Sequence, residues 1–165
     1  MRLTAQEVRT NPNVPRYLDK ILKKMARILR AEGREARSWC YLTIRRKSDG
    51  SVVQILEGGR CPVEKASKYL LLSLEKGGRL HITAQTKGHV ASSQSANEKK
   101  EQYGGAIMLG DLSFSISGLP TGLADEATSL ALAMSLNALS IRQCTHIVEV
   151  TSNHTARKLL VEELA

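Results

Sequence analysis

The chain has 165 residues, 42% of them hydrophobic, which is ordinary for a globular protein and argues against disorder. Its formal net charge of +8 permits binding to nucleic acid, anionic lipid or an acidic ligand without choosing among them. Only 4% of the residues are aromatic, fewer than we expect of a protein that stacks single-stranded bases on a sheet.

The cysteines and the N-terminus indicate a cytoplasmic protein. The three cysteines, Cys40, Cys61 and Cys144, form neither a CxxC motif nor an evenly spaced framework, a pattern typical of free thiols in a reducing compartment. The N-terminal sequence lacks the apolar segment of a signal peptide. Because no apolar run approaches the length that spans a bilayer, we expect no membrane segment.

The first third of the chain predicts two helices and a hairpin. TAQE, Thr4 to Glu7, has the form of a capping box and predicts a short helix. From about Pro15 to Ala36 apolar residues recur at helical spacing between basic ones, which predicts an amphipathic helix. SWCYLTIRR (38–46) and SVVQILE (51–57) predict two strands joined at a Ser-Asp-Gly turn.

The middle of the chain predicts a helix, a strand and a loop. The helix runs from Pro62 to about Lys76, where Gly77-Gly78 would end it as a C-cap. RLHITAQ (79–85) alternates apolar and polar residues and predicts a third strand. Residues 86–105 are small, polar and charged, which predicts a long mobile loop.

The last third predicts a hairpin, a buried helix and a final strand and helix. GAIMLGDLSFSISG (105–118) forms the hairpin, and the apolar stretch after it, to Leu139, forms the helix. THIVEV (145–150) predicts a strand, and residues 152–165 a helix. This order predicts a single α+β domain over residues 1–165, with a mostly antiparallel sheet.

Cys61 is the first candidate for chemistry. Pro62 after it suits the first position of a helix, which would make Cys61 the N-cap. A thiol facing free amides and the positive end of the helix dipole, beside Arg60 and Lys65, would have a lowered pKa. Such a thiolate could be a nucleophile, a redox sensor or an axial haem ligand. The alternative is a small cap that fills a pocket.

Four short motifs resemble the GlcG/HbpS-like family, which includes the C-terminal module of the PduO cobalamin adenosyltransferases. They are Lys65-Ala66, Gly104-Gly105, Ser117-Gly118 and Asp125-Glu126. The resemblance covers roughly residues 15–140 and implies a profilin-like antiparallel sheet flanked by helices. It also implies homo-oligomers and, as in some members, binding of haem or a corrinoid. The predicted strand and helix beyond residue 143 have no counterpart in the family pattern.

Other residue patterns give little support to the common catalytic and metal sites. The four histidines form no HxxxH, HxH or Cys/His cluster, and GxSxG, HExxH and GxxxxGKS motifs are missing. Asp125-Glu126 could be paired acid-base carboxylates, but a helix start also favours acidic residues because of its dipole. His89, in the predicted loop, could approach a ligand or simply face solvent.

The sequence therefore predicts an oligomeric binding protein, without catalysis, for a haem, another tetrapyrrole or a small anionic ligand. The candidate ligand-binding residues are Arg60, Cys61, Lys65 and His89. One alternative is a protein that binds nucleic acid through the basic residues of the first long helix. A second alternative is a thiol enzyme that uses Cys61.

Overall fold

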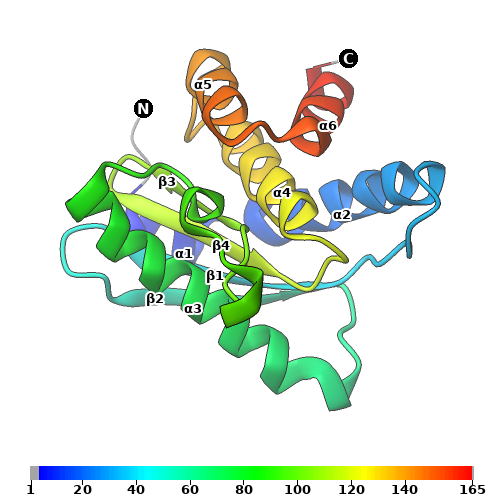
Figure 1. The fold of residues 1–165 in the computed structure, drawn as a ribbon, viewed down its shortest axis with the longest axis horizontal. Coiled ribbons are helices and arrows are strands. Elements are labelled where there is room, and N and C mark those ends of the chain that lie inside the picture. The colour runs from blue at the N-terminus through cyan, green and yellow to red at the C-terminus, as the bar shows by residue number, and fades with distance from the viewer. Residues whose placement is uncertain (1–3, 165) are drawn as a thin grey trace.

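The computed structural model describes residues 4–164, drawn as a ribbon in Figure 1. Within this range the elements are α1 (Ala5–Thr10), α2 (Asn13–Ala31), β1 (Cys40–Arg46), β2 (Val52–Gly58), α3 (Val63–Lys87), η1 (Ser92–Ser95), η2 (Glu98–Lys100), β3 (Ala106–Leu109), β4 (Leu112–Ser117), α4 (Gly122–Ser135), α5 (Ile141–Thr151) and α6 (His154–Leu164). No helix in this range is long and apolar enough to cross a membrane. The predicted α+β class is confirmed.

The sheet has four antiparallel strands in the order β2-β1-β4-β3. Both predicted hairpins are confirmed, since β1 pairs with β2 and β3 pairs with β4. β1 also pairs with β4, which joins the hairpins into one sheet. The result is an antiparallel sheet flanked by helices, as the family resemblance implied.

One face of the sheet is apolar and is covered by α2 and α4. Leu42 and Ile44 of β1 lie opposite Ile116 and Phe114 of β4, and all four side chains are fully buried. A Cβ on Gly58 of β2 would lie 2.8 Å from a methyl carbon of Leu18, so α2 packs directly on this face. These residues continue into the main hydrophobic core.

The opposite face is polar and is covered by α3. Thr43 of β1 lies opposite Ser115 of β4, and both are fully buried. The Ser73 hydroxyl of α3 donates to the Ser115 carbonyl at 2.7 Å, and the Ser115 hydroxyl donates to the Ser73 carbonyl at 2.6 Å. α3 is therefore held to the sheet by hydrogen bonds where α2 and α4 use apolar contacts.

The strand predicted at residues 79–85 is wrong, because α3 continues through Gly77-Gly78 to Lys87. A Cβ on Gly77 would lie 3.1 Å from the Arg45 Nε and 3.3 Å from the Ser115 Cβ. The glycine thus lets the helix approach the sheet closely rather than ending it. The left-handed residue that caps the helix is Gly88, with φ +67°.

The strand predicted at residues 145–150 is also wrong, because this stretch belongs to the helix α5. A capping box of Ser140 and Gln143 starts α5. Cys144, Ile147 and Val148 are buried on one side, which is helical spacing. The C-terminal addition to the sheet is therefore a pair of helices, α5 and α6, which lie beyond α4 in Figure 1.

α4 is nearly all apolar, and its cover comes from within the chain. It packs on β3 and β4 and against α2 and α6. Residues 124–133 are all buried. The composition of α4 therefore does not require a second subunit, and the homo-oligomer stays a prediction.

The predicted loop 86–105 is partly folded. Its first two residues belong to α3, and η1 and η2 follow. Ala91 and Ser92 are fully buried, and the Ser92 carbonyl accepts a hydrogen bond from Arg79 of α3 at 2.7 Å. The mobility of the segment stays a prediction.

Candidate functional site

Three of the predicted site residues lie together at the start of α3. Arg60 and Cys61 precede the helix and Lys65 lies in its first turn. The N-cap is Pro62, not Cys61, so the thiol does not accept a hydrogen bond from a first-turn amide. The Cys61 Sγ lies 3.4 Å from the Pro62 carbonyl oxygen, and the Cys61 amide donates to the Glu57 carboxylate at 2.9 Å.

The predicted lowering of the Cys61 pKa is wrong. Burial raises the pKa of this thiol, and the carboxylates of Glu57 and Glu64 raise it further, while Lys65 opposes them. A thiol held in its neutral form is a poor nucleophile and a poor metal ligand. The structure therefore weakens both the thiol-enzyme alternative and the thiolate-ligand role.

His89 lies at the other end of α3. It follows the C-cap Gly88, and the 25 residues of α3 separate it from Cys61. An α-helix of this length is about 37 Å long, at a rise of 1.5 Å per residue. Cys61 and His89 therefore cannot ligate one haem iron within a chain, and the structure does not bring the four predicted residues together.

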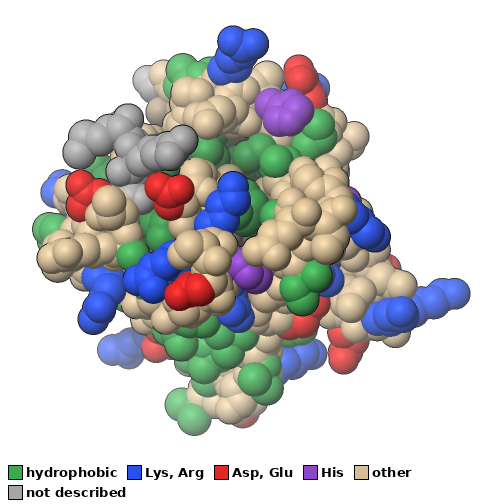
Figure 2. All heavy atoms as spheres, turned by 90° about the vertical axis from the view of Figure 1, so that its left-hand side faces the viewer, with side chains coloured by type: hydrophobic (Ala, Val, Ile, Leu, Met, Phe, Trp, Pro, Cys, Tyr) green, Lys and Arg blue, Asp and Glu red, His purple; other side chains and the backbone are tan. Residues whose placement is uncertain are grey.

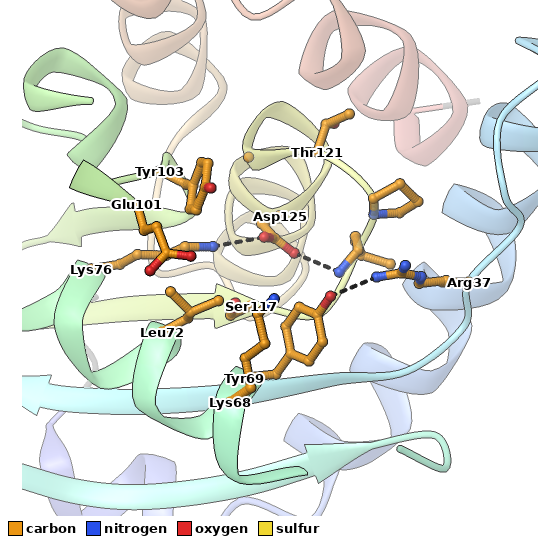
Figure 3. A pocket seen from close by; sticks show the side chains of 13 residues that line it. Arg37, Lys68, Tyr69, Leu72, Lys76, Glu101, Tyr103, Ser117, Thr121 and Asp125 are labelled. Atoms are coloured by element: carbon orange, nitrogen blue, oxygen red, sulfur yellow. Dashed lines mark hydrogen bonds and ion pairs between the residues drawn. The ribbon is translucent and has the colours of Figure 1, made fainter. Parts of the chain in front are cut away.

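A cavity of about 230 Å³ opens elsewhere, between α3, the end of β4 and the start of α4 (Figure 3). We call it the Lys76–Asp125 cavity. Its lining is Arg37, Lys68, Tyr69, Leu72, Lys76, Glu101, Tyr103, Ser117, Leu119, Pro120, Thr121, Gly122 and Asp125. Segments far apart in the sequence thus meet around one space.

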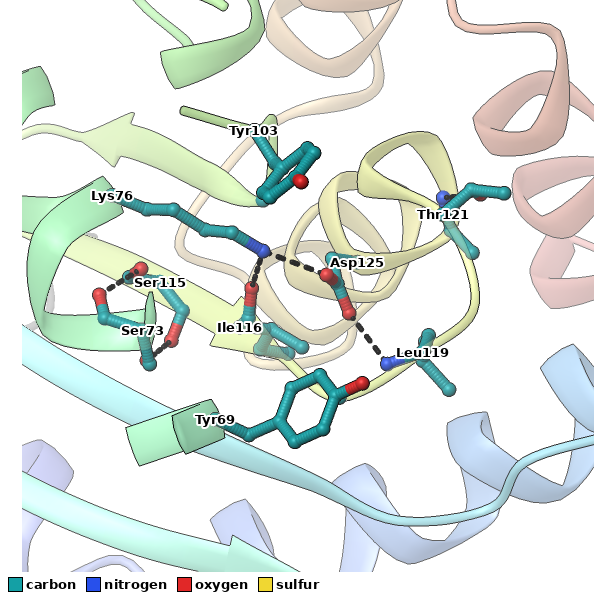
Figure 4. A network of polar contacts seen from close by, with 12 residues as sticks. Tyr69, Ser73, Lys76, Tyr103, Ser115, Ile116, Leu119, Thr121 and Asp125 are labelled. Atoms are coloured by element: carbon teal, nitrogen blue, oxygen red, sulfur yellow. Dashed lines mark hydrogen bonds and ion pairs between the residues drawn. The ribbon is translucent and has the colours of Figure 1, made fainter. Parts of the chain in front are cut away.

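Lys76 and Asp125 form a buried ion pair in the wall of this cavity (Figure 4). The Lys76 Nζ lies 2.7 Å from an Asp125 carboxylate oxygen and donates to the Ile116 carbonyl at 3.0 Å. The other Asp125 oxygen accepts the Leu119 amide at 3.0 Å. The two side chains are 1% and 4% exposed, so the pair is almost entirely removed from water.

Burial controls the ionisation of Asp125. It raises the pKa of this carboxyl to about 6, although Lys76 and the Leu119 amide both favour the charged form. The neighbouring Glu126 is also buried, and burial raises its pKa too. Glu126 points to a different partner, the Asn153 side-chain amide at 3.1 Å. Helix-dipole stabilisation alone does not account for these two acidic residues.

Cationic and aromatic side chains surround the mouth of the cavity. The Arg37 guanidinium donates to the Tyr69 hydroxyl at 3.0 Å and to the Gly118 carbonyl at 3.1 Å. The same guanidinium lies over the Trp39 and Tyr69 rings, 5.4 and 5.8 Å from their centroids. Lys68 is exposed, and within residues 4–164 it has no ion pair.

The start of α4 adds a positive end of a helix dipole. Thr121 is the N-cap, and its hydroxyl accepts the Ala124 amide at 3.1 Å. Thr121 and Gly122 both line the cavity. In a helix of 14 residues the first-turn amides carry a partial positive charge, which favours an anion nearby.

The Gly-Gly motif at residues 104–105 makes room for the ion pair. A Cβ on Gly105 would lie 2.4 Å from the Ile116 carbonyl oxygen and 2.8 Å from the Lys76 Nζ. Gly105 also has φ +142°, a conformation that other residues rarely adopt. Three of the four family-like motifs, Gly104-Gly105, Ser117-Gly118 and Asp125-Glu126, thus converge on this site.

Comparison with known proteins gives one structural similarity to report. No protein-family model and no curated protein sequence matches the chain. A crystal structure of HbpS is similar with a TM-score of 0.45 and 16% sequence identity, over 82% of this chain and 91% of that chain. HbpS is one of the two names of the family whose motifs the sequence resembles.

Proposed function

We propose that the protein binds a small anion-bearing molecule, such as a carboxylate or a phosphate ester, in the Lys76–Asp125 cavity. The observation that carries this proposal is the buried ion pair in the cavity wall. Replacing a buried ion pair by apolar residues is often neutral or stabilising, so fold stability alone does not explain it. Buried charged groups with a specific partner beside a cavity are typical of functional sites.

The charges around the cavity favour an anion over a cation. Asp125 is already paired with Lys76, and Arg37 lies 2.9 Å from the Glu35 carboxylate, which leaves Lys68 and the helix start as the sources of positive potential that lack a counter-charge. Glu101 is the remaining carboxylate in the lining, and it lies in the wall formed by the segment after η2. A ligand anion is therefore best placed beside Lys68 and the helix start, away from Glu101.

The size of the cavity limits the ligand. Its volume of about 230 Å³ is below the roughly 300 Å³ at which sites for drug-sized ligands begin. A tetrapyrrole exceeds this space, so we do not propose the haem of the family resemblance for this cavity. A small metabolite with one or two anionic groups suits it.

The experiment is a titration of ¹⁵N-labelled protein with inorganic phosphate, malonate and succinate, followed by amide chemical shifts. We expect saturable shifts around Tyr69, Ser117 and Gly122 for at least one of these anions. Lys68→Glu reverses an exposed charge at the mouth, and we expect affinity to fall about tenfold, as for the loss of a charge-assisted contact. Lys20→Glu, an exposed change on α2, is the matched control.

Unchanged affinity in Lys68→Glu, or equal losses in both variants, would contradict the proposal. Equal losses would show that the anions respond to net charge alone, since both variants change it by the same amount.

The nucleic-acid alternative rests on the basic face of α2, where three of the six cations have an ion pair within the described chain. Lys23 pairs with Asp19 at 2.9 Å, and Lys24 pairs with Glu163 of α6 at 2.6 Å. Arg27 lies 3.7 Å from Glu162. These pairs leave fewer free cations for phosphates than the sequence indicated. A titration with short DNA and RNA at two salt concentrations tests this alternative by its salt slope.

A further inference from the structure

A second hollow lies along the edge of the sheet formed by β3, and we call it the β3 groove. It has a volume of about 490 Å³, within the range of small-molecule sites. Its apolar lining consists of Val90, Met108, Leu139 and Ile147. Leu139 and Ile147 are almost fully buried, whereas Val90 and Met108 are half-buried and form the accessible part of this surface.

The polar lining of the β3 groove is basic. Lys47 comes from the turn after β1, and Arg142 and His146 come from one face of α5, four residues apart. The remaining lining residues are Gly110 and Gln143, so no carboxylate lines the groove. Within residues 4–164, neither Lys47 nor Arg142 has an ion pair. Figure 2 shows this side of the molecule, where apolar side chains lie near basic ones and a histidine.

Arg142 is placed against the requirements of its own helix. It is the second residue of α5, where the positive end of the helix dipole disfavours a cation. No ion pair or side-chain hydrogen bond within the described chain compensates Arg142 there. An exposed cation without a counter-charge beside an apolar hollow is suitably placed to contact an anionic ligand.

A third hollow, between α2 and α6, differs from the β3 groove in its counter-charges. It also combines apolar and basic side chains, including Arg27, Arg157 and Lys158. There Lys158 pairs with Glu32 at 2.7 Å and Arg27 lies 3.7 Å from Glu162, so that groove contains its own counter-charges. The β3 groove combines an apolar floor with cations that lack counter-charges.

We propose that the β3 groove binds an amphipathic carboxylate, a small molecule with an apolar body and an anionic end. The body lies against Val90 and Met108, and the carboxylate accepts hydrogen bonds from Arg142 and Lys47. His146 lies one helical turn beyond Arg142 and contributes a third polar contact. This site is separate from the Lys76–Asp125 cavity, with which it shares no lining residue.

The test is isothermal titration calorimetry with decanoate below its micelle concentration. We expect one decanoate per chain, much weaker binding of propionate, and no binding of decyltrimethylammonium, which has the same chain length and the opposite charge. Arg142→Glu removes the main charged partner of the decanoate carboxylate. We therefore expect this variant to weaken decanoate binding about tenfold or more. An acidic residue suits the first turn of a helix, so this variant is expected to fold.

The control variants are Lys20→Glu for net charge and Lys68→Glu for the other cavity, and both should bind decanoate like the wild type. Equal binding of decyltrimethylammonium, or wild-type affinity in Arg142→Glu, would overturn the proposal. So would binding of propionate to Lys68→Glu as tight as that of decanoate, because the other cavity is impaired in this variant and the apolar floor of the β3 groove would then contribute nothing. A loss in Lys68→Glu alone would place decanoate in the Lys76–Asp125 cavity and would also overturn it.

Discussion

The two faces of the sheet are chemically opposite, although helices cover both of them. Towards α2 and α4 the strands present Leu42, Ile44 and Phe114, which join the hydrophobic core. Towards α3 the same strands present Thr43 and Ser115, which exchange hydrogen bonds with the helix. A polar interface of this kind can be continued into a polar cavity without exposing apolar surface. The candidate site accordingly lies on the α3 side of the sheet.

The difference between the two faces also explains where the Lys76–Asp125 ion pair lies. On the α3 side, Lys76 reaches past the end of β4, where it contacts the Ile116 carbonyl, to the start of α4, which belongs to the other layer. Asp125 and Lys76 therefore join the polar layer to the apolar one at the cavity. Each charge is acceptable there only because the other one is present.

The largest expected effect is the loss of one partner of this pair. Lys76→Met leaves Asp125 buried without a counter-charge and is expected to lower the free energy of unfolding by about 3–5 kcal/mol. Urea denaturation measures this change. The double variant Lys76→Met/Asp125→Leu removes both charges, and we expect it to recover most of the loss. A double variant as unstable as Lys76→Met would show that packing, not charge, holds this junction.

The second prediction concerns pH and depends on the direction of the Asp125 shift. The folded pKa of about 6 lies above the ordinary value of 3.8, so the folded chain keeps a proton that the unfolded chain releases. The stability that this proton contributes is present below about pH 4 and is lost as the pH rises through 6. The free energy of unfolding of the wild type, minus that of Asp125→Asn, should therefore decrease between about pH 4 and about pH 7.

Urea denaturation of both proteins across this interval is the measurement. The carboxylates with lowered pKa, such as Glu7 and Glu32, are present in both proteins and cancel in the difference. A difference that increases with pH would mean that Lys76 stabilises the carboxylate more than burial penalises it.

The smallest expected effect concerns Cys61. Because it is not the helix cap, Cys61→Ser is expected to change the free energy of unfolding by less than about 0.5 kcal/mol. Cys61 should still react first with iodoacetamide, through exposure rather than acidity. Cys40 and Cys144 are buried, and burial raises the pKa of Cys144 to about 11. Mass spectrometry of the partly alkylated protein gives the order, and faster labelling of Cys144 would contradict this account.

Local patterns were sufficient for the elements that satisfy their own rules. The capping box at Thr4 is present, and the apolar stripe of α2 is buried as its spacing predicts. The Ser-Asp-Gly turn joins β1 to β2 as expected. In each case a few neighbouring residues are sufficient to predict the element, because its formation does not depend on a distant contact.

The errors occurred where distant contacts reverse the local signal. Gly77-Gly78 has the form of a helix end, yet the helix continues because the sheet, with Arg45, approaches it there. α3 buries Ser73 and Lys76, while Leu71 of the same helix is 64% exposed. A leucine-rich helix is expected to bury its leucines. Only the pairing of Thr43 with Ser115 makes the polar side of α3 its inner side.

The sequence by itself determined the fold class, the two hairpins and the start of a helix directly after Cys61, since these depend on residues close in the chain. It also contained the motifs that surround the cavity, without showing that they meet. The tertiary structure alone decided that Lys76 pairs with Asp125, 49 residues away, and that Cys61 and His89 lie at opposite ends of α3. The physical reason is that burial and charge pairing are properties of the packed chain, whereas turns, caps and periodicity are properties of its segments.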